Sequence, residues 1–289
     1  TLSSLGAEIH YQDSFNMVPE VFKAASKTLV VYTPAIPASH QELNAFQVQD
    51  FTILKRSHVL GMIANQGYCM AVAGTHGKTT TSAILAHLLK ECGIKVTAFL
   101  GGILENTNSN LVLEGNDVMV VEADEFDRSF LQLQPDVACI TSMDADHLDI
   151  YDSHENLQAT FKEFAQRIKK PQALYVRQGL PLDGITFGLD SSATISAQQI
   201  CVENGGYTFD IHAGDEIIRS VRFALPGYHN IANALAAFAM ALNVCDSKEQ
   251  LAEALSSFQG VHRRFSYRLK SPQVLIDDYA HHPSEIDAV

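Results

Sequence analysis

One short stretch of the chain combines the residue types that hold a phosphate group. It is an apolar run followed by a turn bounded by two glycines and then by a Lys-Thr pair: Ala71-Val72-Ala73-Gly74-Thr75-His76-Gly77-Lys78-Thr79-Thr80-Thr81. Glycines let backbone N–H groups close around an anion, and the N-terminus of a following helix adds positive potential. Lys78 can reach the outer phosphates, and the Thr79 hydroxyl can bind Mg²⁺. The pattern therefore predicts a nucleotide-phosphate site made by residues 74–80.

The loop departs from the common phosphate-binding pattern at one position. That pattern has a glycine six residues before the lysine, and Val72 occupies this place. A turn that only connects a strand to a helix is the alternative interpretation. Because such a turn has no need of the Lys78-Thr79 pair, we favour phosphate binding.

Acidic and histidine side chains follow two further apolar runs, which read as buried parallel strands. Residues 118–121 lead into Glu122, and residues 137–141 lead into a segment that contains His147. Ligands of open α/β sheets gather at the carboxyl ends of the strands. We therefore predict that Glu122, His147 and Thr79 bind Mg²⁺. A purely structural role is the alternative for His147.

The acid-rich run that begins at Glu122 is longer than a metal site needs. A Mg²⁺ ion between phosphate oxygens uses one or two carboxylates and keeps several waters. Asp127 is therefore interpreted as part of a solvated acidic loop, and the same interpretation is the alternative for Glu125.

The elements that must position these residues alternate between strand-like and helix-like patterns. Apolar, β-rich runs at 28–33 and 69–73, and the two runs described above, are separated by helical patterns such as the one at 79–90. This alternation is typical of a parallel sheet flanked by helices. From 171 to 226, short apolar runs between Pro, Gly and Ser residues predict added antiparallel strands. The predicted fold class is α/β, a P-loop-type parallel sheet with added antiparallel strands.

Composition excludes several classes of protein. With 33 Asp and Glu against 20 Lys and Arg, the chain has a formal charge of −13, which argues against nucleic-acid binding. The five cysteines are widely spaced, which favours a reducing, cytoplasmic setting. No apolar stretch approaches 18 residues, so no membrane insertion is expected. Because Thr1 is not a methionine and Val289 lies in a helix-like pattern, we expect a sequence cut short at both ends.

Taken in order, the motifs resemble those of the Mur ligases of peptidoglycan synthesis. The phosphate loop is followed by Glu122-Ala123-Asp124-Glu125 and then by Asp146-His147-Leu148-Asp149. Three later stretches continue the resemblance: Leu225 to Ala234, Phe258 to Phe265, and Asp277-Asp278-Tyr279-Ala280-His281-His282-Pro283. The resemblance implies part of a Rossmann-like, UDP-sugar-binding domain at 1–66, a central ATP-binding domain at 67–264, and the start of an amino-acid-binding domain at 265–289.

The resemblance also implies roles for residues outside the loop. Three side chains would lie at the adenine of ATP: His229, Asn230 and Asn233. Helix capping is the alternative for Asn230. Catalytic roles would fall to Lys78, Arg263, Arg264, Asp277 and His281. One of the two arginines would neutralise the sugar carboxylate or an acyl phosphate, and the other would be a surface residue.

Within this family, His76 and the stretch that begins at Asp277 point to the member that joins L-alanine to UDP-N-acetylmuramate, with ATP and Mg²⁺, through an acyl phosphate. A member that joins a whole peptide to the same sugar shares these motifs and is the alternative. A folylpolyglutamate synthase fits less well, because its loop and acidic motifs differ. The alternative from another class is a nucleotide-binding module without ligase chemistry, and the 289-residue chain is expected to be inactive in ligation by itself.

Overall fold

The computed structural model describes residues 2–144, 151, 153–203, 205–281 and 286–287. The chain divides into two compact units, Thr1–Ile63 and Ala64–Val289. The finer division at residues 66 and 264 stays a prediction. No helix in the described ranges is long and apolar enough to cross a membrane.

The first unit is built around two parallel strands with a helix between them. β1 (Leu29–Tyr32) pairs with β2 (Thr52–Lys55), and α1 (Gln41–Val48) lies between them in the sequence. α2 (Arg56–Ala64) begins directly after β2. Four 3₁₀ turns precede β1: Leu2–Leu5, Phe15–Met17, Glu20–Phe22 and Ala25–Lys27. A parallel pair requires such a crossover, so this is a small βαβ unit.

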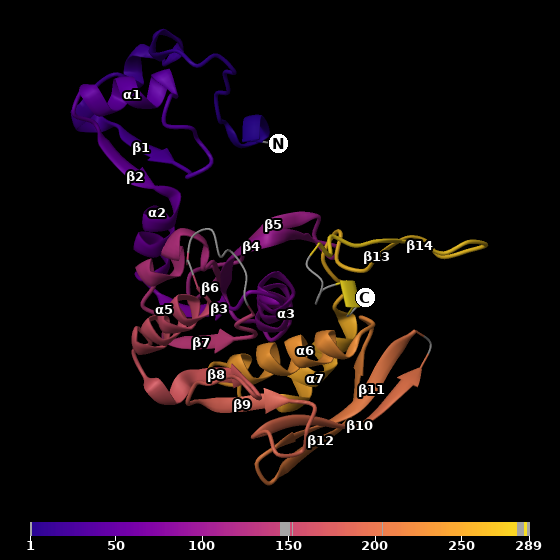
Figure 1. Ribbon diagram of the computed structural model, residues 1–289. Coiled ribbons are helices and arrows are strands. Elements are labelled where there is room, and N and C mark those ends of the chain that lie inside the picture. The colour runs from indigo at the N-terminus through magenta and orange to yellow at the C-terminus, as the bar shows by residue number, and fades with distance from the viewer. Residues whose placement is uncertain (1, 145–150, 152, 204, 282–285, 288–289) are drawn as a thin grey trace. The chain divides into compact units, whose positions relative to one another are not determined.

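The second unit contains a ten-stranded sheet in the order β12-β11-β10-β9-β8-β7-β3-β6-β4-β5 (Figure 1). Its strands are β3 (Tyr68–Ala73), β4 (Val96–Leu104), β5 (Ser109–Leu113), β6 (Val118–Ala123), β7 (Val137–Ile140), β8 (Leu174–Arg177), β9 (Ile185–Gly188), β10 (Ile195–Glu203), β11 (Gly206–Ala213) and β12 (Glu216–Phe223). The seven strands from β10 to β4 pair in parallel, and β5, β11 and β12 add antiparallel edges. The predicted α/β fold class is confirmed. The predicted antiparallel segment is smaller than 171–226, since β8, β9 and β10 extend the parallel part and the antiparallel pairs begin between β10 and β11.

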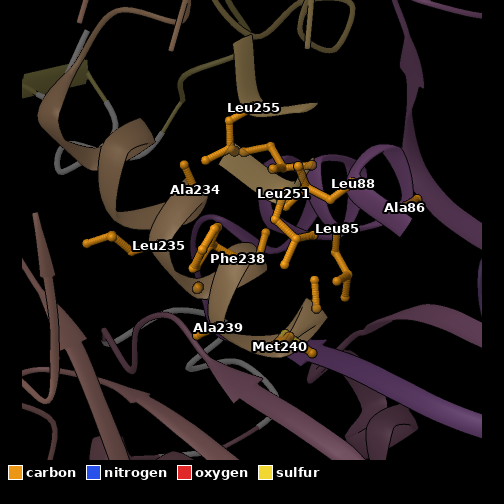
Figure 2. Packing of buried hydrophobic residues seen from close by; sticks show 14 of the residues in the cluster. Leu85, Ala86, Leu88, Ala234, Leu235, Phe238, Ala239, Met240, Leu251 and Leu255 are labelled. Atoms are coloured by element: carbon orange, nitrogen blue, oxygen red, sulfur yellow. The ribbon is translucent and has the colours of Figure 1, made fainter. Parts of the chain in front are cut away.

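Three helices pack together on one face of this sheet: α3 (Lys78–Glu91), α6 (Tyr228–Ala241) and α7 (Lys248–Ser257). Figure 2 shows Leu85 and Leu88 of α3 beside Phe238 of α6 and the leucines of α7. Alternate residues of β3 enter the same core, among them Met70 and Val72. The β3 residues between them are also fully buried, as expected for a central parallel strand covered on both faces.

A short 3₁₀ segment and α5 form a second packing layer. η5 (Phe126–Gln132) follows β6, and α5 (His154–Gln166) is the amphipathic helix that apolar spacing predicts. The rings of Phe130 and Phe164 stack with their centroids 4.8 Å apart. η6 (Pro171–Ala173) leads from this layer back into β8.

The segment after residue 264 pairs with itself. β13 (Ser266–Leu269) and β14 (Leu275–Asp277) form a two-stranded antiparallel sheet. The sequence predicts an isolated strand there, without a partner to hold it. That expectation is wrong in one respect, because β13 supplies the backbone partner of β14. The helix-like pattern that contains Val289 and is expected from residue 283 onward lies largely outside the described residues.

His87 links the helix after the phosphate loop to α7 and gives the fold a predicted pH dependence. Its Nε2 lies 3.0 Å from the Ala254 carbonyl oxygen and 2.8 Å from the Ser257 hydroxyl. Burial lowers the pKa of His87 in the folded chain. Below about pH 6.5, where an unfolded histidine takes up a proton, the unfolded state therefore gains protons that the folded state does not. We therefore expect the free energy of unfolding to decrease as the pH is lowered through this range.

Denaturant unfolding at several pH values between about 7.5 and 5.5 measures this effect. One histidine limits its contribution to about 1.4 kcal/mol per pH unit. His87→Gln should flatten the profile, whereas His58→Gln, at an exposed position of α2, should not. A His87→Gln profile as steep as that of the parent would exclude His87 as the source.

Candidate functional site

A cavity of about 530 Å³ opens where four parallel strands of the second unit end. The phosphate loop follows β3, Glu122 is the second-to-last residue of β6, Thr141 follows β7, and Arg177 is the last residue of β8. The remaining lining residues come from loops after β6 and β7, from α6 and from the segment after residue 263: Asp124, Ser142, Asp144, His229, Asn230, Asn233, Arg264, Phe265, Asp278, Ala280 and His281. The cavity therefore joins sequence-predicted residues from four parts of the chain.

The phosphate loop needs both of its glycines for its shape. Gly74 has φ 136° and Gly77 has φ 82°, in the region that residues with a side chain rarely adopt. A Cβ on Gly74 would lie 2.1 Å from the Thr141 hydroxyl oxygen, and one on Gly77 would lie 2.7 Å from Oδ1 of Asn233. Gly74 does not line the cavity, whereas residues 75–80 do.

Side chains from the end of β7 hold this loop in place. The Ser142 hydroxyl accepts a hydrogen bond from the backbone N–H of His76 at 2.7 Å and lies 2.9 Å from the Thr75 hydroxyl. The Thr141 hydroxyl donates to the carbonyl of His76. Sequence reasoning missed both residues. The sequence carries no signal for them, because only the order of the strands shows that the ends of β7 and β3 meet at one edge of the sheet.

Lys78 forms an ion pair with a buried carboxylate. Its Nζ lies 2.9 Å from Oε1 and 2.7 Å from Oε2 of Glu125, a residue with 0% of its surface exposed. Burial raises the pKa of the Glu125 carboxyl, and the charge of Lys78 opposes that shift. The interpretation of Glu125 as part of a solvated loop is therefore wrong. It is buried because its side chain turns inward to Lys78.

Glu122 faces the first turn of α3. It pairs in register with Val72 of β3, which places its carboxylate beside the phosphate loop. Oε1 accepts a hydrogen bond from the Thr79 hydroxyl at 3.0 Å, and Oε2 accepts one from the backbone N–H of Gly101 at 2.9 Å. Burial raises the pKa of Glu122, against the opposing charge of Lys78. His147, the other predicted metal ligand, lies outside the described residues.

α6 brings its predicted residues to the wall of the cavity. Its first turn contains His229, whose pKa is lowered by burial. Asn230 donates through Nδ2 to the carbonyl of Pro226 at 2.6 Å, and Nδ2 of Asn233 lies 3.4 Å from Oδ1 of Asn230. The two asparagines share one face of the helix, as their spacing predicts.

The double arginine and the segment after it contribute unequally to the cavity. Both guanidinium groups lie over the ring of Tyr279, at 4.8 Å for Arg263 and 5.8 Å for Arg264. Arg264 lines the cavity and Arg263 does not. Asp277 is turned away toward Arg268, at 3.1 Å, while its neighbour Asp278 faces the cavity.

Asp278 and His281 also line the cavity, and Asp278 shapes the chain around it. Its Oδ2 accepts a hydrogen bond from the backbone N–H of Phe265 at 2.7 Å. The roles predicted for Asp277 and His281 stay predictions. Sequence reasoning did not select Asp278, since the two neighbouring aspartates differ only in the direction in which the backbone turns them.

Arg177 is a cavity residue that sequence reasoning also missed. It ends β8, and burial lowers the pKa of its guanidinium group. A positive charge at the carboxyl end of a parallel strand is the signal that could have found it. Together with Lys78 and Arg264 it places three cations around the cavity of an acidic protein.

Comparisons with known proteins agree with this arrangement. A model of the Mur ligase middle domain matches residues 72–241. The UDP-N-acetylmuramate–L-alanine ligase of Christiangramia forsetii is 52% identical over 284 residues, and that of Cytophaga hutchinsonii is 42% identical over 302 residues. These alignments cover 98% and 100% of this chain, but the chain spans only 63% and 64% of the length of these relatives.

Solved structures give the same grouping. The UDP-N-acetylmuramate–alanine ligase of Thermotoga maritima aligns with a TM-score of 0.85 at 28% identity, over 99% of this chain and 67% of that one. The UDP-N-acetylmuramate:L-alanyl-γ-D-glutamyl-meso-diaminopimelate ligase of Neisseria meningitidis aligns at 0.78 with 22% identity, over 91% of this chain and 87% of that one, which shows a shared fold alone. Because the family model covers more than half of the chain and close relatives cover nearly all of it, this chain belongs to the Mur ligase family.

Proposed function

We propose that this chain binds ATP and serves the ligation of L-alanine to UDP-N-acetylmuramate. The observation that carries the proposal is the shared cavity, in which the phosphate loop, Glu122 and the asparagines of α6 meet Arg264. A loop that only connected a strand to a helix would not need these groups around it. The relatives at 42–52% identity, named as L-alanine ligases, support the choice of substrates.

In this proposal the loop and α6 hold the nucleotide. Backbone N–H groups at the start of α3 and the Lys78 ammonium neutralise the triphosphate. His229, Asn230 and Asn233 lie at the base. Asn233 also packs against the backbone of Gly77, so it couples the base end of the cavity to the phosphate end.

The residues present fit a magnesium ion. Thr79 and Glu122 put a hydroxyl and a carboxylate oxygen side by side at the loop, and hard oxygen ligands of this kind are the ones that Mg²⁺ takes beside phosphate oxygens and water. When bound, Mg²⁺ would neutralise charge on the phosphates. His147 stays a predicted ligand.

The proposed reaction joins two anions, and the cations around the cavity make this possible. The sugar carboxylate attacks the γ-phosphorus of ATP, which forms an acyl phosphate and releases ADP. The alanine amine then attacks the acyl carbon, loses a proton and releases inorganic phosphate. In this proposal Arg264, which lines the cavity, neutralises the carboxylate or the acyl phosphate, and Arg263, over the Tyr279 ring, holds Tyr279 beside it.

Phosphate release tests this function. A protein that spans the full length of these relatives should release phosphate from ATP only when UDP-N-acetylmuramate and L-alanine are both present, and nucleotide binding by the 289-residue chain should not require either. Replacing L-alanine by a peptide that begins with L-alanine serves as the matched control. Faster release with the peptide would favour the peptide ligase, and nucleotide binding without any acceptor-dependent release would favour the binding module.

A further inference from the structure

Glu125 is a buried carboxylate that the proposed reaction leaves without a role. It has 0% of its surface exposed and does not line the cavity, yet both of its oxygens lie within 2.9 Å of the Lys78 ammonium. A carboxylate is costly to bury unless it is paired and hydrogen-bonded. A residue with a merely structural role at this position could be apolar and would avoid that cost.

The backbone around Glu125 is held firmly. Its carbonyl accepts hydrogen bonds from the buried Tyr151 hydroxyl and from the backbone N–H of Arg128. Asp127 and Arg128 adopt φ values of 52° and 53°, a conformation that residues with a side chain rarely take. The Arg128 guanidinium lies 6.0 Å from the centre of the Tyr151 ring. These contacts fix the backbone that carries the carboxylate paired with Lys78.

We propose that Glu125 is a positioning residue for Lys78, an anion that fixes the ammonium in the direction of the phosphates. The proposal rests on the ATP-binding function proposed above. Lysine is a compact charge on a flexible four-carbon stem, so its direction must come from a partner. Among the described residues, the side-chain hydrogen bonds of Lys78 go to the two oxygens of Glu125, and the third donor of the ammonium is left for a ligand.

The positioning has opposite effects on binding and on turnover. Glu125 repels the triphosphate, and it competes with the triphosphate for Lys78, so it weakens nucleotide binding in the ground state. It also prevents the ammonium from reorienting as charge develops on the transferred phosphoryl group, which favours the transition state. Replacing a residue that only stabilised the fold would not lower turnover while leaving nucleotide binding unchanged or stronger.

Glu125→Gln tests the proposal, because glutamine keeps the shape and removes the charge. At saturating ATP, kcat for phosphate release should fall roughly 10-fold to 100-fold, while KM for ATP should stay the same or fall. Glu125→Asp keeps the charge but is one methylene short, and it should restore turnover only in part. Glu163→Gln, which removes a carboxylate from an exposed pair with Arg167 on α5, is the matched control and should leave both constants unchanged.

A double-variant cycle separates positioning from folding. If Glu125 acts through Lys78, then Lys78→Ala/Glu125→Gln should turn over no more slowly than Lys78→Ala alone. If the double variant lost turnover by the product of the two single-variant factors, the proposal would be overturned. A folded Glu125→Gln protein with the kcat of the parent would overturn it as well. A parent protein that neither binds ATP nor releases phosphate would instead refute the function on which the proposal rests.

Discussion

Replacing Lys78 with alanine should lower acceptor-dependent phosphate release by at least roughly 10²–10³-fold at saturating ATP. Lys78 is the cation of the phosphate loop nearest to the proposed triphosphate, and no other side chain of the loop carries a fixed positive charge. Phosphate release and nucleotide binding by the same preparations measure the effect. A correctly folded variant with undiminished phosphate release would contradict the assignment of the loop.

The same change should also lower stability, which separates two effects of one residue. Removing Lys78 takes away the charged partner of the buried Glu125, and breaking a buried ion pair costs about 3–5 kcal/mol. Adding Glu125→Gln should recover part of that free energy of unfolding without recovering turnover. Lys90→Ala is the control, because Lys90 lies in the last turn of α3 and pairs with the exposed Glu114 that follows β5, so its loss should change neither quantity appreciably.

Glu122→Gln should raise the magnesium concentration needed for half-maximal turnover and lower the maximal rate. Glutamine can still accept the hydrogen bond from the Thr79 hydroxyl, so the loop should keep its shape while the metal loses an anionic oxygen. We expect a shift of about 10-fold or more, on the scale of one lost charge-assisted contact. Magnesium titrations at fixed ATP measure it.

A surface carboxylate provides the comparison for this variant. Glu114→Gln removes an acidic side chain from the exposed pair with Lys90. Glu114 lies eight residues before Glu122 in the sequence. Its titration curve should overlay that of the parent. If the curve of Glu122→Gln also overlays that of the parent, Glu122 does not bind the metal.

Local sequence was sufficient for the features that depend on neighbouring residues. The phosphate loop needs two glycines at fixed distances before a helix, and Gly74, Gly77 and Lys78 occupy those places in the structure. The two asparagines of α6 lie three residues apart, which places them on one helix face whatever surrounds the helix. The alternation of apolar runs and helical patterns likewise predicts a parallel sheet, because each run can be buried only between helices.

The tertiary structure decided what depends on distant parts of the chain. The order β7-β3-β6 brings Ser142 to the backbone of His76, across 66 residues of sequence, and only strand order could show that these ends meet. Glu125 looks like its acidic neighbours in the sequence, but in the structure it is fully buried and paired with Lys78. Whether a side chain is buried, and which group it pairs with, depend on residues from many segments of the chain. A pattern within one segment therefore predicts where a residue lies along a helix or strand, and not what its side chain faces.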